Sequence, residues 1–207
     1  SWFLSDAPTY ELADVVQGKC FIQDAIVPVA QVQNLFVLPT FGIGGTLKLY
    51  SETKLAEEPY VLQDLIKEVS DTYDRIILDL SPGLGRLERA ALISSDEVIT
   101  PMTPEVFSLD GLEIFIDELN KLRKNLRSPV RHTKIIINSF DNRIKQHRDI
   151  YTAACEGVFT VYKIPVDPLF RKAQEAGCAP QLFKVRGKGL KESTIDSIKT
   201  LNKEIWR

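Results

Sequence analysis

The stretch YDRIILDLSPGLGRLERAAL, residues 73–92, determines which fold we expect for the chain. Residues 75–80 (RIILDL) form a nearly continuous apolar run, as is typical of a strand covered by helices on both faces of a parallel sheet. Ser-Pro-Gly follows at residues 81–83, and residues 84–95 have a helical pattern. The stretch therefore predicts a strand that ends in an aspartate, Asp79, followed by a turn and a helix.

The rest of the chain repeats this alternation of short apolar runs and amphipathic runs. Repeated strand and helix units of this length predict an α/β fold with a doubly wound, mostly parallel sheet. The 207 residues, 44% of them hydrophobic, are enough for one globular domain with a substantial core. We expect strands at residues 34–39, 75–80, 96–101, 133–138 and 158–165, and helices at residues 59–73, 84–95, 108–126, 141–157, 167–177 and 193–206.

Several classes of protein are disfavoured by the composition. No apolar run approaches the roughly 18 residues that a membrane span requires, and residues 1–12 lack the pattern of a signal peptide. Three widely spaced cysteines, Cys20, Cys155 and Cys178, predict neither a disulfide framework nor a metal cluster, and they fit a reducing cytoplasm. Cys155 falls on a helix face, where we expect it in the core. With only His132 and His147 besides, a zinc site is not expected.

The charges are divided unevenly along the chain. Residues 1–118 carry 7 basic and 20 acidic side chains, whereas residues 119–207 carry 19 basic and 8 acidic ones, a net charge of +11. A basic half on a chain of net charge −2 hints at a surface for a polyanion. The alternative is that these Lys and Arg side chains simply cover exposed helix faces.

Polar residues at the ends of the expected strands are the candidates for a ligand site, because ligands bind beyond the carboxyl ends of strands in such sheets. Asp79 is a candidate for holding Mg²⁺, directly or through water. It is alternatively a loop residue ahead of a helix with Ser81 as its N-cap and Pro82 at its first position.

Two further strand ends carry groups suited to a purine. The amide of Asn138 can both donate to and accept from a purine edge, although a turn residue is the simpler reading. Residues 164–168 (IPVDP) place a flat proline and a carboxylate beside the same expected edge of the sheet, and Asp167 and Pro168 form the start of the next helix.

The glycine-rich segment GIGG, residues 42–45, does not have the form of a phosphate-binding loop. Such a loop needs Lys and Ser or Thr directly after its glycines, but Gly45 is followed by Thr46, Leu47 and Lys48. We expect a mobile loop here.

Several segments, taken together and in order, resemble the ParA branch of the deviant Walker ATPases, the plasmid and chromosome partition proteins, which are close to MinD. Residues 73–85 (YDRIILDLSPGLG) are similar to the family's Tyr-Asp-x-Ile-Ile-x-Asp-x-Pro-Pro-x-x-Gly. Residues 94–112 (SSDEVITPMTPEVFSLDGL), 135–143 (IIINSFDNR) and 162–183 (YKIPVDPLFRKAQEAGCAPQLF) match its later segments. The resemblance implies a ParA- or MinD-type P-loop fold over essentially the whole chain.

The resemblance also implies the ligands and their residues. It implies ATP or ADP with Mg²⁺, with Asp79 as the catalytic, metal-holding aspartate of the Walker B type. Asn138 would face the adenine edge, and Pro165, Val166 and Asp167 would pack along the base. Non-specific DNA binding is implied for Arg143 and Arg171, and the further candidates for DNA contact are Lys145, Arg148, Lys163, Arg186 and Lys188.

The chain departs from the family pattern in two ways. The family's Lys-Gly-Gly-x-Gly-Lys-Thr-Thr loop, with its first strand and helix, is expected ahead of Ser1, so these 207 residues alone are not expected to hydrolyse ATP. Ser81 also stands where the family usually has proline.

The implied function is an ATP-dependent plasmid or chromosome partition protein of the bacterial cytoplasm, associated with the nucleoid. ATP would close a homodimer that binds DNA non-specifically, and a partner of the ParB type would trigger hydrolysis. One alternative is a non-enzymatic DNA-binding or regulatory relative. Another is a MinD-like cell-division positioning ATPase, which would need an amphipathic basic tail that residues 201–207 (LNKEIWR) lack. No membrane association is therefore expected.

Overall fold

The computed structural model describes residues 4, 7–30, 32–41, 45–126, 128 and 130–205. The chain forms two compact units, the first made by residues 1–96 and 121–130 and the second by residues 97–120 and 131–207. Each unit has its own buried apolar clusters. The single domain expected over residues 1–207 stays a prediction.

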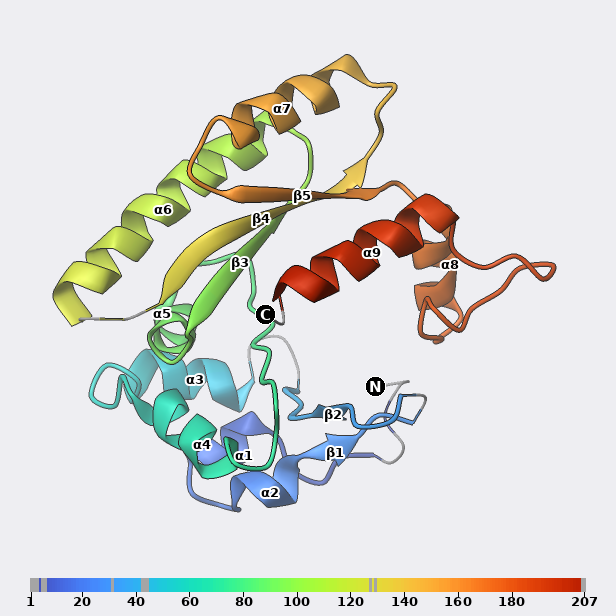
Figure 1. Ribbon diagram of the computed structural model, residues 1–207. Helices are drawn as coiled ribbons and strands as arrows, with labels where there is room; N and C mark the ends of the chain where they lie inside the picture. Colours follow the sequence, from blue (N-terminus) through green and yellow to red (C-terminus); the bar gives the residue numbers. More distant parts are fainter. Residues whose placement is uncertain are drawn as a thin grey trace. The chain divides into compact units, whose positions relative to one another are not determined.

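The first unit consists of short helices and one small antiparallel pair of strands (Figure 1). Strand β1 pairs with β2 through Val27 opposite Val37 and Pro28 opposite Phe36. Two apolar clusters hold the helices together, one around Tyr50 and Leu62 and the other around Ile22 and Val69. Its elements are α1 (Leu12–Val16), α2 (Ile22–Ala25), β1 (Val27–Pro28), β2 (Phe36–Val37), α3 (Thr46–Thr53), α4 (Val61–Val69) and α5 (Arg86–Ile93).

The second unit is built on a three-stranded parallel sheet in the order β3-β4-β5. Figure 1 shows α6 and α7 on one face of this sheet and α9 on the other. The elements are β3 (Glu97–Met102), α6 (Val106–Leu126), β4 (Arg131–Phe140), α7 (Lys145–Cys155), β5 (Thr160–Pro165), α8 (Pro168–Glu175) and α9 (Glu192–Ile205); the last residues of α6 belong to the first unit. The predicted α/β class with a parallel sheet is confirmed.

The central strand β4 explains why this sheet forms from these residues. Ile135 and Ile137 are completely buried, and Leu112 of α6 and Ile150 of α7 join them in one cluster. β-branched side chains suit a pleated surface that is covered by helices. Among the described residues, no helix combines the length and the apolar composition needed to cross a membrane.

The strand predicted at residues 75–80 is absent from the structure. These residues belong to no strand or helix, and Ile76 and Ile77 are 40% and 72% exposed. A strand needs a neighbour to pair its backbone N–H and C=O groups, and no described segment pairs with this one. An apolar β-branched sequence was therefore not sufficient to specify a strand.

Other expectations in the first unit and on α7 also need correction. Helix α5 begins at Arg86 with Gly85 as its N-cap, so Ser81 and Pro82 do not start it; the Ser81 hydroxyl instead donates to Glu88.

The expected strand at residues 34–39 is reduced to β2, and α1, α2 and α3 were not predicted. Residues 42–44 of the GIGG segment lie outside the described residues, while its last residue, Gly45, is the N-cap of α3. Cys155, expected in the core, is exposed at the end of α7.

Shortening a buried side chain of β4 should destabilise the fold far more than the same change in residues 75–80. We expect Ile137→Ala to lower the free energy of unfolding by about 3 kcal/mol, because the side chain is completely buried and leaves a cavity. Ile77→Ala, at a position 72% exposed, should cost less than about 1 kcal/mol. Urea denaturation of both variants measures the difference, and equal losses would show that residues 75–80 are buried as a strand.

Candidate functional site

The end of strand β4 carries an irregularity that shapes a hollow beside the sheet. The pairing of β4 with β5 shifts register between Ile137 and Phe140, and Ser139 between them has a φ of 56°. This left-handed conformation is uncommon for a residue other than glycine, and such residues gather at functional sites. The Ser139 amide donates to Oδ1 of Asn138 at 2.9 Å, which fixes the Asn138 side chain at the strand end.

The hollow at this strand end has a volume of about 650 Å³, within the usual range of small-molecule sites. It lies within the second unit and brings together the four residues predicted to contact a base, Asn138, Pro165, Val166 and Asp167. Arg171, which was predicted to bind DNA, also lines it. The lining residues are Asn138, Ser139, Pro165, Val166, Asp167, Pro168, Phe170, Arg171, Lys172 and Glu175.

Asp167 fixes one wall of this hollow. Its side chain is buried and caps α8 by accepting a hydrogen bond from the Leu169 amide at 3.1 Å. Its second oxygen accepts from the Lys191 amide at 2.9 Å and from the Thr194 hydroxyl at 3.1 Å. Both oxygens therefore already have protein donors, so Asp167 primarily positions the wall, and its contact with a base stays a prediction.

The environment of Asp167 favours its charged form. Burial alone would raise the pKa of this carboxyl, but the hydrogen bonds from the Lys191 and Leu169 amides and the Thr194 hydroxyl outweigh it and lower the pKa. Its hydrogen bonds therefore stabilise the fold above the ordinary pKa of an aspartate.

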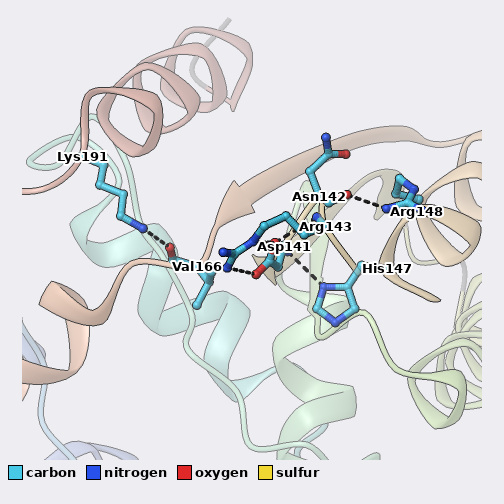
Figure 2. A network of polar contacts seen from close by, with 7 residues as sticks. All are labelled: Asp141, Asn142, Arg143, His147, Arg148, Val166 and Lys191. Carbon is cyan, nitrogen blue, oxygen red and sulfur yellow. Dashed lines mark hydrogen bonds and ion pairs between the residues drawn. The ribbon is translucent and has the colours of Figure 1, made fainter. Parts of the chain in front are cut away.

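Two contacts at Val166 also hold this wall, and Figure 2 shows the one with Lys191. The Val166 amide donates to the Phe140 carbonyl at 3.0 Å, and the Val166 carbonyl accepts from Nζ of Lys191 at 3.0 Å. Phe140 of β4 and Lys191, which directly precedes α9, thus both hold Val166, the residue that follows β5.

A second cluster lies just after β4, around Asp141 (Figure 2). Nη2 and Nε of Arg143 donate to the two carboxylate oxygens at 2.6 and 3.0 Å, and the Asp141 amide donates to Nδ1 of His147 at 3.0 Å. Hydrogen bonds from Arg143 hold the pKa of Asp141 well below its usual range. Arg143 is exposed, but its charge is already paired with a carboxylate.

The residues predicted to bind DNA differ in whether a carboxylate neutralises them. Lys145 lies 3.8 Å from Asp149, and Arg171 lies 3.1 Å from Glu175. Arg186 and Lys188 are exposed and form no ion pair with any described residue. Of the remaining candidates, Arg148 donates to the Asn142 carbonyl at 2.7 Å, and Lys163 lies 4.4 Å from the centre of the Tyr151 ring. Among the described residues, the candidates whose side chains have neither a carboxylate nor another polar or aromatic partner are thus Arg186 and Lys188, in the segment between α8 and α9.

Asp79 belongs to the first unit, whereas the residues that line the hollow belong to the second. Its side chain is exposed and has no hydrogen-bond partner among the described residues. The expected convergence of Asp79 and Asn138 on one nucleotide stays a prediction. The first unit also has a hollow of its own, of about 720 Å³, whose lining includes Gly45, Lys48, Ser81, Arg86 and Glu88.

Several residues of the site were not predicted from the sequence. Ser139, Phe170 and Lys172 line the hollow, and Lys191 and Thr194 hold its wall. The motif around Asn138 and the cap at Asp167 located the site, but nothing in the sequence pairs Asp167 with residues 24 and 27 positions later.

Comparison with known protein families shows which family the chain belongs to. The family model AAA_31, described as an AAA domain, matches residues 4–132. The chain belongs to this family. Its relatives and structural neighbours include Soj and MinD ATPases, so the resemblance to the ParA and MinD ATPases is confirmed.

Two curated relatives are similar over most of the chain. The protein BBD21 of Borreliella burgdorferi is 33% identical over 150 residues, which are 71% of this chain and 59% of that protein. The chromosome-partitioning ATPase Soj of Treponema pallidum is 29% identical over 139 residues, 66% of this chain and 53% of Soj. The chain thus spans little more than half the length of these relatives.

Solved structures share the fold. A putative plasmid partition protein from Borrelia burgdorferi bound to AMPPNP has a TM-score of 0.69 at 20% identity, covering 95% of this chain and 74% of that one. Cobyrinic acid a,c-diamide synthase from Mycobacterium smegmatis, with bound ADP and magnesium, has a TM-score of 0.66 at 19% identity. The match covers 79% of this chain and 67% of the synthase chain. The fold is therefore that of the MinD and ParA ATPases.

Removing the Asp167 carboxylate should loosen the wall of the hollow. We expect Asp167→Ala to lower the free energy of unfolding by about 2 kcal/mol at pH 7, because three donors lose their acceptor. Asp196→Ala, on the exposed side of α9, should change it by less than about 0.5 kcal/mol.

The pH dependence distinguishes a charge effect from lost packing. Because the folded-state pKa of Asp167 is lowered, its contribution is complete above the unfolded value of about 3.9 and is lost as the pH falls through the folded value. Denaturation curves from pH 7 down to the acid range should show the Asp167→Ala difference shrinking. A difference independent of pH would contradict this assignment.

Proposed function

We propose that this chain is the base-recognising and DNA-binding part of an ATP-dependent partition protein. The family comprises partition and cell-division ATPases, and plasmid partition proteins are among its structural neighbours. The observation that carries the proposal is the hollow at the end of β4, which gathers Asn138 with Pro165, Val166 and Asp167.

The chemistry of this hollow suits adenine. Oδ1 of Asn138 accepts from Ser139 and retains a second lone pair, while its amide nitrogen has no partner among the described residues. The amide can therefore donate to a ring nitrogen of adenine and accept from its exocyclic amine. Guanine presents an oxygen in place of that amine, so an amide that donates to N7 and accepts from the group on C6 loses its second contact when guanine replaces adenine.

Binding of the ATP phosphates and of Mg²⁺ is proposed for residues that do not line this hollow. ATP would be accompanied by Mg²⁺, which neutralises charge on the phosphates and takes only one or two carboxylates, and Asp79 is the carboxylate proposed for it. No group of three or more His, Cys, Asp or Glu among the described residues could hold a metal ion by itself. Hydrolysis, an ATP-closed homodimer, a ParB-type partner and a cytoplasmic, nucleoid-associated location belong to the same proposal for the whole protein.

Non-specific DNA binding is proposed for the basic side chains near the hollow. Phosphate contacts need clustered Lys and Arg but no sequence readout. Arg171 is on the helix that lines the hollow, and Arg143 follows the strand end that forms it. This arrangement places candidate phosphate contacts and the proposed base contacts on neighbouring elements of one unit.

Replacing the Asn138 amide should weaken ATP binding and remove base selectivity. We expect Asn138→Ala to raise the Kd for ATP about tenfold and to reduce the preference for ATP over GTP, because one amide makes both base contacts. Isothermal titration of the chain with each nucleotide measures the two constants.

The matched control is Asn142→Ala, since Asn142 does not line the hollow and offers only its backbone carbonyl to Arg148. This variant should bind ATP as the unsubstituted chain does. Equal effects of the two substitutions, or unchanged selectivity in Asn138→Ala, would contradict the proposed base site.

Removing two of the proposed phosphate contacts should weaken DNA binding regardless of sequence. We expect Arg143→Gln with Arg171→Gln to lower affinity for duplex DNA and to reduce the slope of log K against log salt by up to about 2. The loss should be less than that of two free cations, because both side chains already pair with carboxylates. Fluorescence anisotropy across a salt series measures the affinity and the slope, and an unchanged slope would show that neither residue contacts DNA phosphates.

A further inference from the structure

The segment between α8 and α9 contains a tight two-residue hairpin, from Val185 to Lys188. The Val185 amide donates to the Lys188 carbonyl at 2.9 Å, and the Lys188 amide donates to the Val185 carbonyl at 3.0 Å. The two central residues, Arg186 and Gly187, have φ values of 50° and 78°. Positive φ at both positions defines a type I′ turn, for which Asn-Gly is the favoured pair.

An arginine at the first central position is an unfavourable choice for the turn itself. Asn, Asp and Gly adopt left-handed φ more easily than a long side chain does. A strained residue kept in an exposed loop is a pointer to function rather than to stability. Arg186 is exposed, and no described residue pairs with its charge.

The hairpin is basic and is held at both ends. Residues 176–191 contain four Lys and Arg side chains and no Asp or Glu. The Cys178 amide donates to the Ala173 carbonyl of α8 on one side, and the Lys191 amide donates to Asp167 on the other. Figure 1 shows this segment extending away from α8 and α9. The hairpin is therefore a short basic projection on a fixed base.

We propose that Arg186 enters the minor groove of duplex DNA while Lys184 and Lys188 contact the flanking phosphates. This inference rests on the DNA binding proposed above and specifies its mode. The minor groove is about 6 Å wide, which suits the insertion of a single extended side chain. A guanidinium at the tip of a two-residue turn suits this opening, and narrow A·T-rich grooves attract it most strongly. An apolar tip would have favoured a lipid surface instead.

The test compares two duplexes of equal length, one with a central A-tract and one of alternating G·C, by fluorescence anisotropy. We expect the unsubstituted chain to prefer the A-tract roughly fivefold. Arg186→Lys should retain the salt dependence but lose the preference, because an ammonium keeps the charge without the planar guanidinium. Lys199→Gln, which removes an exposed charge on α9, should keep the preference.

Arg186→Asn provides a second readout that a merely structural role would not give. Because Asn suits the turn better, this variant should raise the melting temperature while lowering DNA affinity and reducing the salt slope by about 1. A lower melting temperature with unchanged DNA binding would overturn the proposal.

The remaining outcomes separate this inference from the proposed function. Binding without an A-tract preference, or a preference that survives in Arg186→Lys, overturns groove insertion but leaves non-specific DNA binding standing. Failure of the unsubstituted chain to bind either duplex would contradict the DNA binding proposed for this chain, and not only the insertion of Arg186. Tighter binding to phosphatidylserine vesicles than to DNA, lost in Arg186→Asn, would reassign the hairpin to lipid surfaces.

Discussion

The carboxylate of Asp167 joins parts of the second unit that are distant in sequence. It caps α8 through the Leu169 amide and holds the start of α9 through Lys191 and Thr194. A buried carboxylate that lost these donors would carry a large desolvation cost, so the three contacts form or fail together. The wall of the hollow, the direction of α8 and the base of the basic segment after it all depend on this one group.

The same interaction relates the proposed ligand sites to one another. Val166 and Asp167 line the hollow, while Lys191, bonded to both, closes the segment that contains the hairpin. The paired arginines and the unpaired cations then have different roles. Arg143 and Arg171 are paired with carboxylates near the hollow, whereas Arg186 and Lys188, at a projecting turn, form no ion pair with any residue that the structure describes. The basic residues of the second half of the sequence thus differ in how available their charge is to an anion.

The sequence predicted those features that depend on local chemistry. The buried run around Ile135 and Ile137 gave β4, and Asp167 followed by Pro168 gave the start of α8. Features that depend on distant partners were missed or wrongly predicted. The run containing Ile76 and Ile77 was expected to be a strand, but strand formation requires a neighbouring backbone that no described segment supplies. The register shift at Ser139 depends on how β4 meets β5, and no local pattern encodes it.

The central claim is that the end of β4 forms a purine site together with the segment after β5. A backbone NMR titration of the chain with ATP tests it most directly. The account predicts saturable shifts at the Ser139, Val166 and Asp167 amides, with weaker shifts there when GTP replaces ATP. Shifts confined to residues around the hollow of the first unit, such as Lys48 and Arg86, with those three amides unmoved, would contradict it.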